Sequence, residues 1–181
     1  MSRMHLIKTR CLPLLIVPVL LSGCGLAQTV SDDTSSAIKS IFYTQVKTLH
    51  LDLTAREALN TDSVEDISLS EPVMIRIYQL KDRKAFDKTV YQQLAKGAES
   101  ALGADLLASR SVVVKPGADT SLNTPLDEQA HFVAVVGLFR APDQAKNDWR
   151  LVLTRDELDP DKPRVIEADN NQLTLQPLKE E

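Results

Sequence analysis

The chain has 181 residues, with 21 basic and 25 acidic side chains and a formal net charge of −4. A content of 43% hydrophobic and 25% charged residues is ordinary for a folded domain, and it excludes both wholesale disorder and a membrane protein with many spans. The acidic balance argues against a general nucleic-acid binder. Two cysteines and six glycines exclude a disulfide framework and a collagen-like chain.

The first residues have the composition of a targeting segment. The basic side chains of Arg3, Lys8 and Arg10 precede the apolar run of residues 11–21. That run is well short of the roughly 20 residues that a membrane-spanning helix needs. A basic start, a short apolar run and then small residues predict a secretory signal peptide over residues 1–23.

The end of that segment, Leu21-Ser22-Gly23-Cys24, resembles the lipobox of bacterial lipoproteins. The resemblance implies that the Cys24 thiol carries a diacylglyceryl group and that the new amino terminus is acylated, with no other cofactor. Several acyl chains give stable membrane anchoring, and Gly25 in second position implies export to the outer membrane. The alternative is an incidental cysteine beside an ordinary cleavage site. Residues 24–40 are polar, so beyond the lipidated cysteine they are expected to form a flexible tether.

The remaining residues, 41–181, are predicted to form a mainly β domain. Residues 48–54 place Leu49, Leu51 and Leu53 on one face, which is the alternation of a half-buried strand. The apolar run 131–139 predicts a central strand that is covered on both faces. Short strand-like runs separated by turn signals favour a two-sheet β-sandwich of seven or eight strands. The other predicted strands are residues 73–80, 110–115, 149–153, 164–167 and 172–176.

One segment departs from the strand pattern. Phe86, Val90 and Leu94 recur every four residues, which predicts a helix that begins near Asp82 and ends at Gly97. A second helical piece is predicted over residues 99–107. We therefore expect a short helical insertion between two strands, with its apolar stripe sealing one end of the core.

The connection after the first predicted strand is long. It spans residues 55–71, which is 17 residues and exceeds the roughly 12–15 at which a loop in a compact domain becomes unusual. Thr54 and Glu57 could cap one short helical turn, and residues 60–66 are expected to be an exposed acidic loop. Loops of this length are usually either binding loops or disordered excursions, and both interpretations stay open.

Residues that could carry catalysis are few. Once the signal is removed, His50 and His131 are the histidines that remain, each alone on a predicted strand, and no nucleophile elbow, phosphate-binding glycine loop or zinc motif occurs. The acidic residues between 156 and 161 lack the pattern of a calcium loop and are interpreted as a solvated turn. Trp149 is interpreted as a core or sheet-edge aromatic residue. We expect no enzymatic activity, no catalytic residue and no metal site.

Several runs, taken in order, resemble the outer-membrane lipoprotein of type VI secretion systems, the TssJ family. They lie downstream of the lipobox, and the resemblance covers about residues 49–175. The runs that carry it are Pro72–Lys81, the segment around Phe86, Leu102–Leu107, Lys115–Gly117, Val135–Arg140 and Trp149–Arg150.

The resemblance implies a transthyretin-like (immunoglobulin-like) β-sandwich that faces the periplasm. The basic residues are scattered without a stripe, so we expect no nucleic-acid partner. The resemblance also implies that the protein anchors the trans-envelope secretion complex at the outer membrane. The implied partner is the periplasmic C-terminal region of the inner-membrane component, of the TssM type, held by the loop between the first two strands. Residues 63–70 form a longer and more acidic stretch than the family pattern has. The implied binding residues are Leu59, Asn60, Thr61, Asp62, Ser63, Val64, Glu65 and Asp66.

Two other classes of function are alternatives to this one. A lipid-anchored binding module for a small ligand or a cell-wall component would need a concave apolar pocket ringed by polar groups. A lipoprotein hydrolase is disfavoured because no nucleophile and base are identifiable in the sequence.

Overall fold

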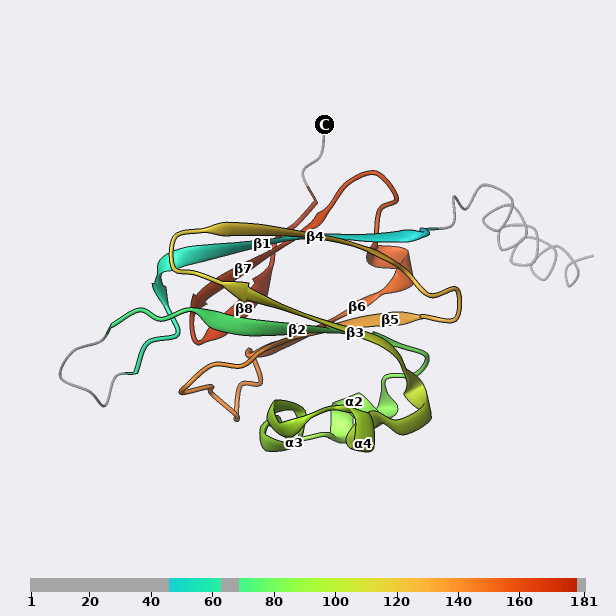
Figure 1. The fold of residues 1–181 in the computed structure, drawn as a ribbon, viewed down its shortest axis with the longest axis horizontal. Coiled ribbons are helices and arrows are strands. Elements are labelled where there is room, and N and C mark those ends of the chain that lie inside the picture. The colour runs from blue at the N-terminus through green and yellow to red at the C-terminus, as the bar shows by residue number, and fades with distance from the viewer. Residues whose placement is uncertain (1–45, 63–68, 179–181) are drawn as a thin grey trace, which may run out of the picture. The chain divides into compact units, whose positions relative to one another are not determined.

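The computed structural model describes residues 46–62 and 69–178, which contain two four-stranded sheets and a short helical layer (Figure 1). The predicted signal peptide, Cys24 and the predicted tether lie outside the described residues. In chain order, the elements are β1 (Thr48–Leu59), β2 (Val73–Leu80), α2 (Lys84–Lys88), α3 (Tyr91–Lys96), α4 (Glu99–Leu102), the 3-10 turn η1 (Gly103–Asp105), β3 (Leu106–Val114), β4 (Asp119–Pro125), β5 (Phe132–Gly137), β6 (Arg150–Thr154), the 3-10 turn η2 (Arg155–Glu157), β7 (Arg164–Asn170) and β8 (Gln172–Leu175).

The first sheet has the strand order β4-β1-β7-β8, with β1 antiparallel to β4 and parallel to β7. The predicted alternation in β1 is confirmed, because its three inward leucines are fully buried. The predicted end of this strand at residue 54 is wrong, and no helical turn follows Thr54. Residues 55–59 stay in the sheet because β7 pairs with them as far as Leu59 opposite Asn170, past a register shift.

Strand β4 was not predicted, since its sequence DTSLNTP is polar. It forms because β1 offers it a full row of partners, from Thr54 opposite Asp119 to Thr48 opposite Pro125. Proline lacks a backbone N–H and is tolerated here because β4 lies at the edge of the sheet. Pairing with a well-determined neighbour therefore decided this strand, and side-chain pattern did not.

The second sheet has the strand order β3-β2-β5-β6, and its neighbouring strands are antiparallel. The prediction of a doubly covered central strand is confirmed by β5, whose residues 133–137 are all buried. One face of β5 meets the first sheet and the other lies under the helical layer (Figure 1). Strand β3 begins at Leu106, four residues before its predicted start.

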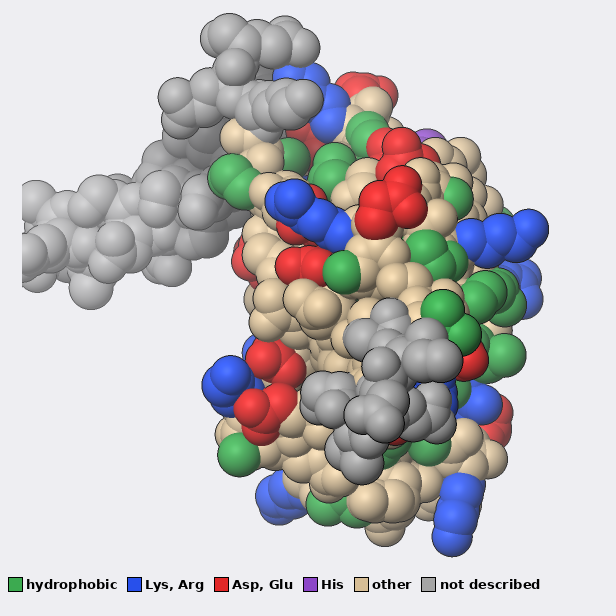
Figure 2. Space-filling model, turned by 90° about the vertical axis from the view of Figure 1, so that its left-hand side faces the viewer, with side chains coloured by type: hydrophobic (Ala, Val, Ile, Leu, Met, Phe, Trp, Pro, Cys, Tyr) green, Lys and Arg blue, Asp and Glu red, His purple; other side chains and the backbone are tan. Residues whose placement is uncertain are grey.

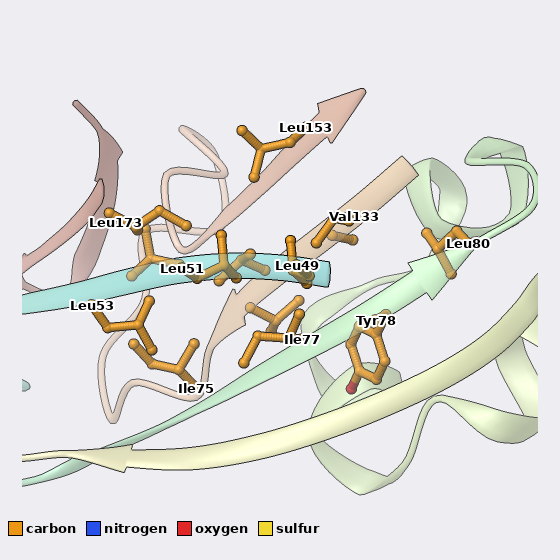
Figure 3. Close-up of a cluster of buried hydrophobic side chains, with 14 of the residues drawn as sticks. Leu49, Leu51, Leu53, Ile75, Ile77, Tyr78, Leu80, Val133, Leu153 and Leu173 are labelled. Atoms are coloured by element: carbon orange, nitrogen blue, oxygen red, sulfur yellow. The ribbon is translucent and has the colours of Figure 1, made fainter. Parts of the chain in front are cut away.

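The core lies between the two sheets. Leu49, Leu51 and Leu53 of β1 project toward Ile75 and Ile77 of β2 (Figure 3), and all five side chains are at most 1% exposed. Burying one such side chain stabilises the fold by about 1.5–3 kcal/mol. These observations confirm a mainly β, two-sheet sandwich with a helical insertion between strands.

The helical insertion differs from the single helix that was predicted. Thr89 and Val90 are extended and separate α2 from α3, and Val90 is 53% exposed instead of buried in the stripe. Arg150 of β6 explains the break, because its Nη1 atom donates to the carbonyl oxygens of Phe86 (3.2 Å) and Thr89 (3.0 Å). A continuous helix would need both oxygens for its own amides. Gly97 ends α3 as predicted.

The insertion also lies in a different place than expected. The Arg76 guanidinium of β2 donates to the Leu94 carbonyl at 2.5 Å, and the Tyr91 hydroxyl donates to the Phe139 carbonyl. Tyr91 also packs edge-on against Trp149, with ring centroids 5.0 Å apart. The helices thus cover the outer face of the β2–β5–β6 region, and the prediction that they seal one end of the core is wrong.

Candidate functional site

The β1–β2 connection runs from residue 60 to residue 72, so it is shorter than the predicted loop. Its two ends are joined by the backbone, since the Glu71 amide donates to the Leu59 carbonyl at 3.0 Å. The Leu59 amide donates in turn to the Ser70 hydroxyl at 3.3 Å. The base of the connection is therefore closed by hydrogen bonds.

Asn60 is the residue that fixes this base. Its backbone has φ 53°, a left-handed conformation that asparagine adopts more readily than most residues, and it is only 4% exposed. Its side-chain nitrogen donates to the Pro72 carbonyl at 3.1 Å, and its side-chain oxygen accepts from the Arg140 amide at 2.7 Å. One carboxamide thus ties the end of β1 to the start of β2 and to the β5–β6 connection.

Two further contacts bring neighbouring connections to the same place. The Arg140 guanidinium lies 3.3 Å from a carboxylate oxygen of Glu71, and the Asn171 side chain donates to the Thr61 carbonyl at 2.8 Å. The β1–β2, β5–β6 and β7–β8 connections therefore meet at one end of the sandwich, which Figure 2 shows face-on. The Arg140–Glu71 pair is solvent-exposed and contributes little stability, but it helps to orient the loop.

A shallow polar depression of about 230 Å³ lies beside this junction. It is lined by Asp143, Lys146 and Asp148 of the β5–β6 connection, by Asn170 at the end of β7 and by Asn171 of the β7–β8 turn. The Asp143 carboxylate accepts hydrogen bonds from the Lys146 and Ala145 amides, which lower its pKa. Polar groups thus surround the base of the β1–β2 connection on this side.

The residues predicted to bind a partner fall into three groups. Leu59 and Asn60 are buried, so the expectation that Asn60 is exposed is wrong, and both residues position the loop. Thr61 and Asp62 are half-buried at its start. The other four, Ser63, Val64, Glu65 and Asp66, lie outside the described residues.

Leu69 is a candidate contact that the sequence reasoning missed. It is 63% exposed, the highest value among the large exposed hydrophobic side chains of the described residues. An apolar side chain within a polar segment was the signal that could have identified it. Arg140 carried no such signal, because its contact with Asn60 spans 80 residues of sequence.

The two histidines of the domain and the acidic turn lie apart from this junction. The His50 ring nitrogen Nδ1 lies 2.5 Å from the Asn123 side-chain oxygen, and His131 is exposed. The Asp159 carboxylate accepts hydrogen bonds from the Asp161 and Lys162 amides, which lower its pKa and confirm the predicted turn.

Trp149 is 1% exposed, so its predicted place in the core is confirmed. Within residues 46–62 and 69–178, histidine, cysteine and carboxylate side chains form no group able to hold a metal ion. In the same part of the chain, no helix is both long and apolar enough to cross a bilayer.

Comparison with known proteins identifies similar chains. Residues 47–176 match the family model described as type VI secretion lipoprotein (VasD, EvfM, TssJ). A search of curated proteins gave no match.

Three solved structures illustrate the similarity. One is described as "T6SS protein TssM C-terminal domain (869-1107) from EAEC" (47% identity, TM-score 0.66) and another as "Type VI membrane complex" (48% identity, TM-score 0.69). In both, 74% of this chain aligns with 100% of the matched chain. The third is the type VI lipoprotein TssJ1 from Pseudomonas aeruginosa, with 25% identity and a TM-score of 0.59 over 74% of this chain and 98% of that chain.

Proposed function

The chain belongs to the TssJ family of type VI secretion lipoproteins, and we propose that it is a non-enzymatic anchor of the trans-envelope secretion complex. In this proposal, the lipid on Cys24 lies in the outer membrane and the sandwich faces the periplasm. The β1–β2 connection binds the periplasmic C-terminal region of the inner-membrane TssM-type component. The observation that carries the proposal is the full coverage of two homologous chains at 47% and 48% identity.

The description of one of those structures supports the choice of partner. It names residues 869–1107 of TssM, a span of 239 residues. The matched chain, however, is covered completely by about 134 residues of this one (74% of 181). A chain of that length is too short to be the named TssM domain. We infer that this structure holds a relative of the present protein beside a TssM domain. That pairing supports a TssM-type partner for this chain.

The geometry of the loop base supports the choice of surface. Binding costs less ordering entropy when the binding segment is held in place beforehand, and Asn60 holds both ends of this segment. Leu69, exposed at the end of the connection, is suited to be an apolar anchor in a pocket of the partner. Thr61, Asp62 and Glu71 supply polar groups around it.

The course of β1 is consistent with a link between membrane and partner. Its first residues follow Val46, whose carbonyl accepts from the Arg155 guanidinium at 2.7 Å. Its last residue leads into the binding connection. A strand of 12 residues is about 40 Å long, so the start of the described domain and the binding connection lie at opposite ends of β1.

The loop is tested by changing Leu69 to serine and measuring affinity for the periplasmic region of the TssM-type component. We expect a loss of about tenfold or more, because a buried apolar anchor contributes 1.4 kcal/mol or more to binding. Val90→Ser is the matched control, since Val90 is also exposed but lies on the helical layer. Equal affinity of the two variants would remove Leu69 and this end of the loop from the interface.

The membrane anchor is tested separately by changing Cys24 to serine. A serine hydroxyl replaces the thiol that receives the diacylglyceryl group, so the variant should lose its lipid and its membrane fractionation. A serine variant that still fractionates with the outer membrane would contradict the lipid anchor and leave the loop proposal untouched.

A further inference from the structure

Strand β3 is an edge strand with one long side open. The order β3-β2-β5-β6 places β2 on one side of it, and no strand of residues 46–62 and 69–178 lies on the other side. With nine residues, it contains no proline and no acidic side chain. The backbone N–H and C=O groups of such an edge are free to pair with another chain.

The hydrogen bonds of β2 show which backbone groups of β3 face outward. The Leu138 amide donates to the Met74 carbonyl at 2.9 Å, so the even-numbered residues of β2 bond to the β5 side. The Lys81 amide donates to the Asp105 carbonyl at 2.9 Å on the other side. The odd-numbered residues of β2 therefore bond to β3.

The direction of these hydrogen bonds shows which backbone groups of β3 are free. Ile75 pairs with Val112, so the even-numbered residues of β3 point their backbone groups toward β2. The N–H and C=O groups of Ser109, Ser111 and Val113 point away from the sheet. All three residues are exposed, and the two serines are small enough to leave the edge accessible.

The other three edges are protected in ways that β3 is not. Strand β4 ends in Pro125, which removes a donor, and β6 and β8 are only five and four residues long. The Leu173 amide also donates to the Asp148 carbonyl at 2.7 Å, which joins β8 to the end of the β5–β6 connection. Proteins protect edge strands with prolines, with short strands and by covering them. The long open edge of β3 is the exception in this fold.

An open groove of about 390 Å³ lies along this edge, between β3 and β4. Ala108, Pro125 and Leu126 supply apolar surface, and Arg110 and Asp127 also line it. Successive side chains of a strand alternate between faces. The groove borders Ala108, Ser109 and Arg110 of β3, so a strand paired with this first half of β3 would place a side chain over it.

The opposite face of the same edge leads to the proposed binding loop. Val113 (54% exposed) pairs with Met74 (40% exposed). This pair lies just beyond Arg76, the residue at which the helical layer ends. Met74 follows Pro72, the last residue of the β1–β2 connection, by two positions. Hydrophobic side chains are visible on this end of the domain in Figure 2. A protein that binds the loop is thus within reach of the β3 edge.

We propose that the protein held by the β1–β2 connection also adds an extended strand to β3. Its backbone bonds to the free groups of Ser109, Ser111 and Val113, and small or apolar side chains lie over the groove. This inference rests on the proposed function, which supplies the partner. A second copy of this chain fits less well as the added strand. Full antiparallel overlap of two β3 strands would set Arg110 of one copy opposite Arg110 of the other, and like charges directly opposite each other destabilise a strand pair.

The test compares Ser111→Pro with Ser111→Ala in the full-length protein. Proline removes the outward N–H without removing a bond to β2, whereas alanine keeps the N–H and changes only the side chain. We expect the proline variant to bind the periplasmic region of the TssM-type component about tenfold or more weakly, and the alanine variant within about twofold of the unaltered chain. Amide exchange of Ser109, Ser111 and Val113 in the unaltered chain should slow in the complex.

Four results would each overturn the inference. Equal affinity of the two variants, or unchanged exchange of the three amides in a complex that forms, rejects strand addition and leaves the loop proposal standing. Slow exchange without the partner, together with a dimeric mass in sedimentation, assigns the edge to a second copy. Failure of the unaltered chain to bind the partner at all rejects the proposed function and strand addition together.

Discussion

Replacing Asn60 by alanine removes the side chain that closes the base of the β1–β2 connection. The carboxamide is 4% exposed and makes two hydrogen bonds, to the Pro72 carbonyl and from the Arg140 amide. The alanine variant loses both bonds and leaves a methyl group on a backbone with φ 53°. The three segments that meet at this point would then be joined by backbone contacts, by the Leu59–Ser70 hydrogen bond and by the exposed Arg140–Glu71 pair.

The expected loss of stability follows from these two effects. Each hydrogen bond contributes about 0.5–1.5 kcal/mol net. A left-handed conformation costs alanine about 1–2 kcal/mol. Asn60→Ala should therefore lower the free energy of unfolding by about 2–5 kcal/mol. Asn60→Gly loses the same bonds but avoids the steric cost, so it should lose about 1–3 kcal/mol.

Urea unfolding measures these differences, with Trp149 as the probe. It is the single tryptophan of the chain and is 1% exposed, so its fluorescence reports on the core. The same variants should bind the partner more weakly, because the loop pays more ordering entropy once its base is released. Asn147→Ala is the control, since Asn147 also has positive φ, at 57°, but is exposed. If both Asn60 variants unfold within about 0.5 kcal/mol of the unaltered chain, the side chain does not hold the loop base.

Two further predictions concern the rest of the domain. The Arg155 guanidinium donates to the carbonyls of Val46 (2.7 Å) and Ala130 (2.8 Å). Arg155→Met should therefore lower the free energy of unfolding by about 2–3 kcal/mol in the same urea assay, and a loss below about 0.5 kcal/mol would contradict this role. Burial raises the pKa of the Tyr91 phenol, which donates a hydrogen bond to the Phe139 carbonyl. The contribution of Tyr91 to stability is therefore present below about pH 10, and it is lost as the pH rises through the higher pKa of the folded state. The unaltered chain should therefore lose more stability than Tyr91→Phe between pH 8 and pH 11, and equal losses would refute the assignment.

The β strands that could be predicted from sequence are those with one or two apolar faces. Leu49, Leu51 and Leu53 alternate so regularly that a strand is the conformation that buries all three together. The apolar run in β5 predicted a doubly covered strand for the same reason. The lipobox-like run and the ordered family-like runs likewise pointed to a type VI secretion lipoprotein, and the family match over residues 47–176 confirms that family.

The elements that were predicted wrongly depend on partners far away in the chain. Strand β4 is polar and exists because β1 pairs with it, and the helix breaks at Thr89 because Arg150, about 60 residues later, takes its carbonyl oxygens. The last residues of β1 stay extended because β7 lies beside them. Local pattern carries no information about such contacts, so these boundaries could not be predicted from it.

The sequence by itself determined the apolar faces, the number of strands to within one and the segment between the first two strands as a candidate for binding. Tertiary structure alone decided that Asn60 is a buried tie between the end of β1, the start of β2 and the β5–β6 connection, and that Leu69, near the other end of the β1–β2 connection, is exposed. It also decided that β3 keeps an open edge, since strand order depends on which strands pair. Periodicity reports which side of a segment avoids water, whereas a site depends on which segments meet, and that is settled only when the two sheets pack.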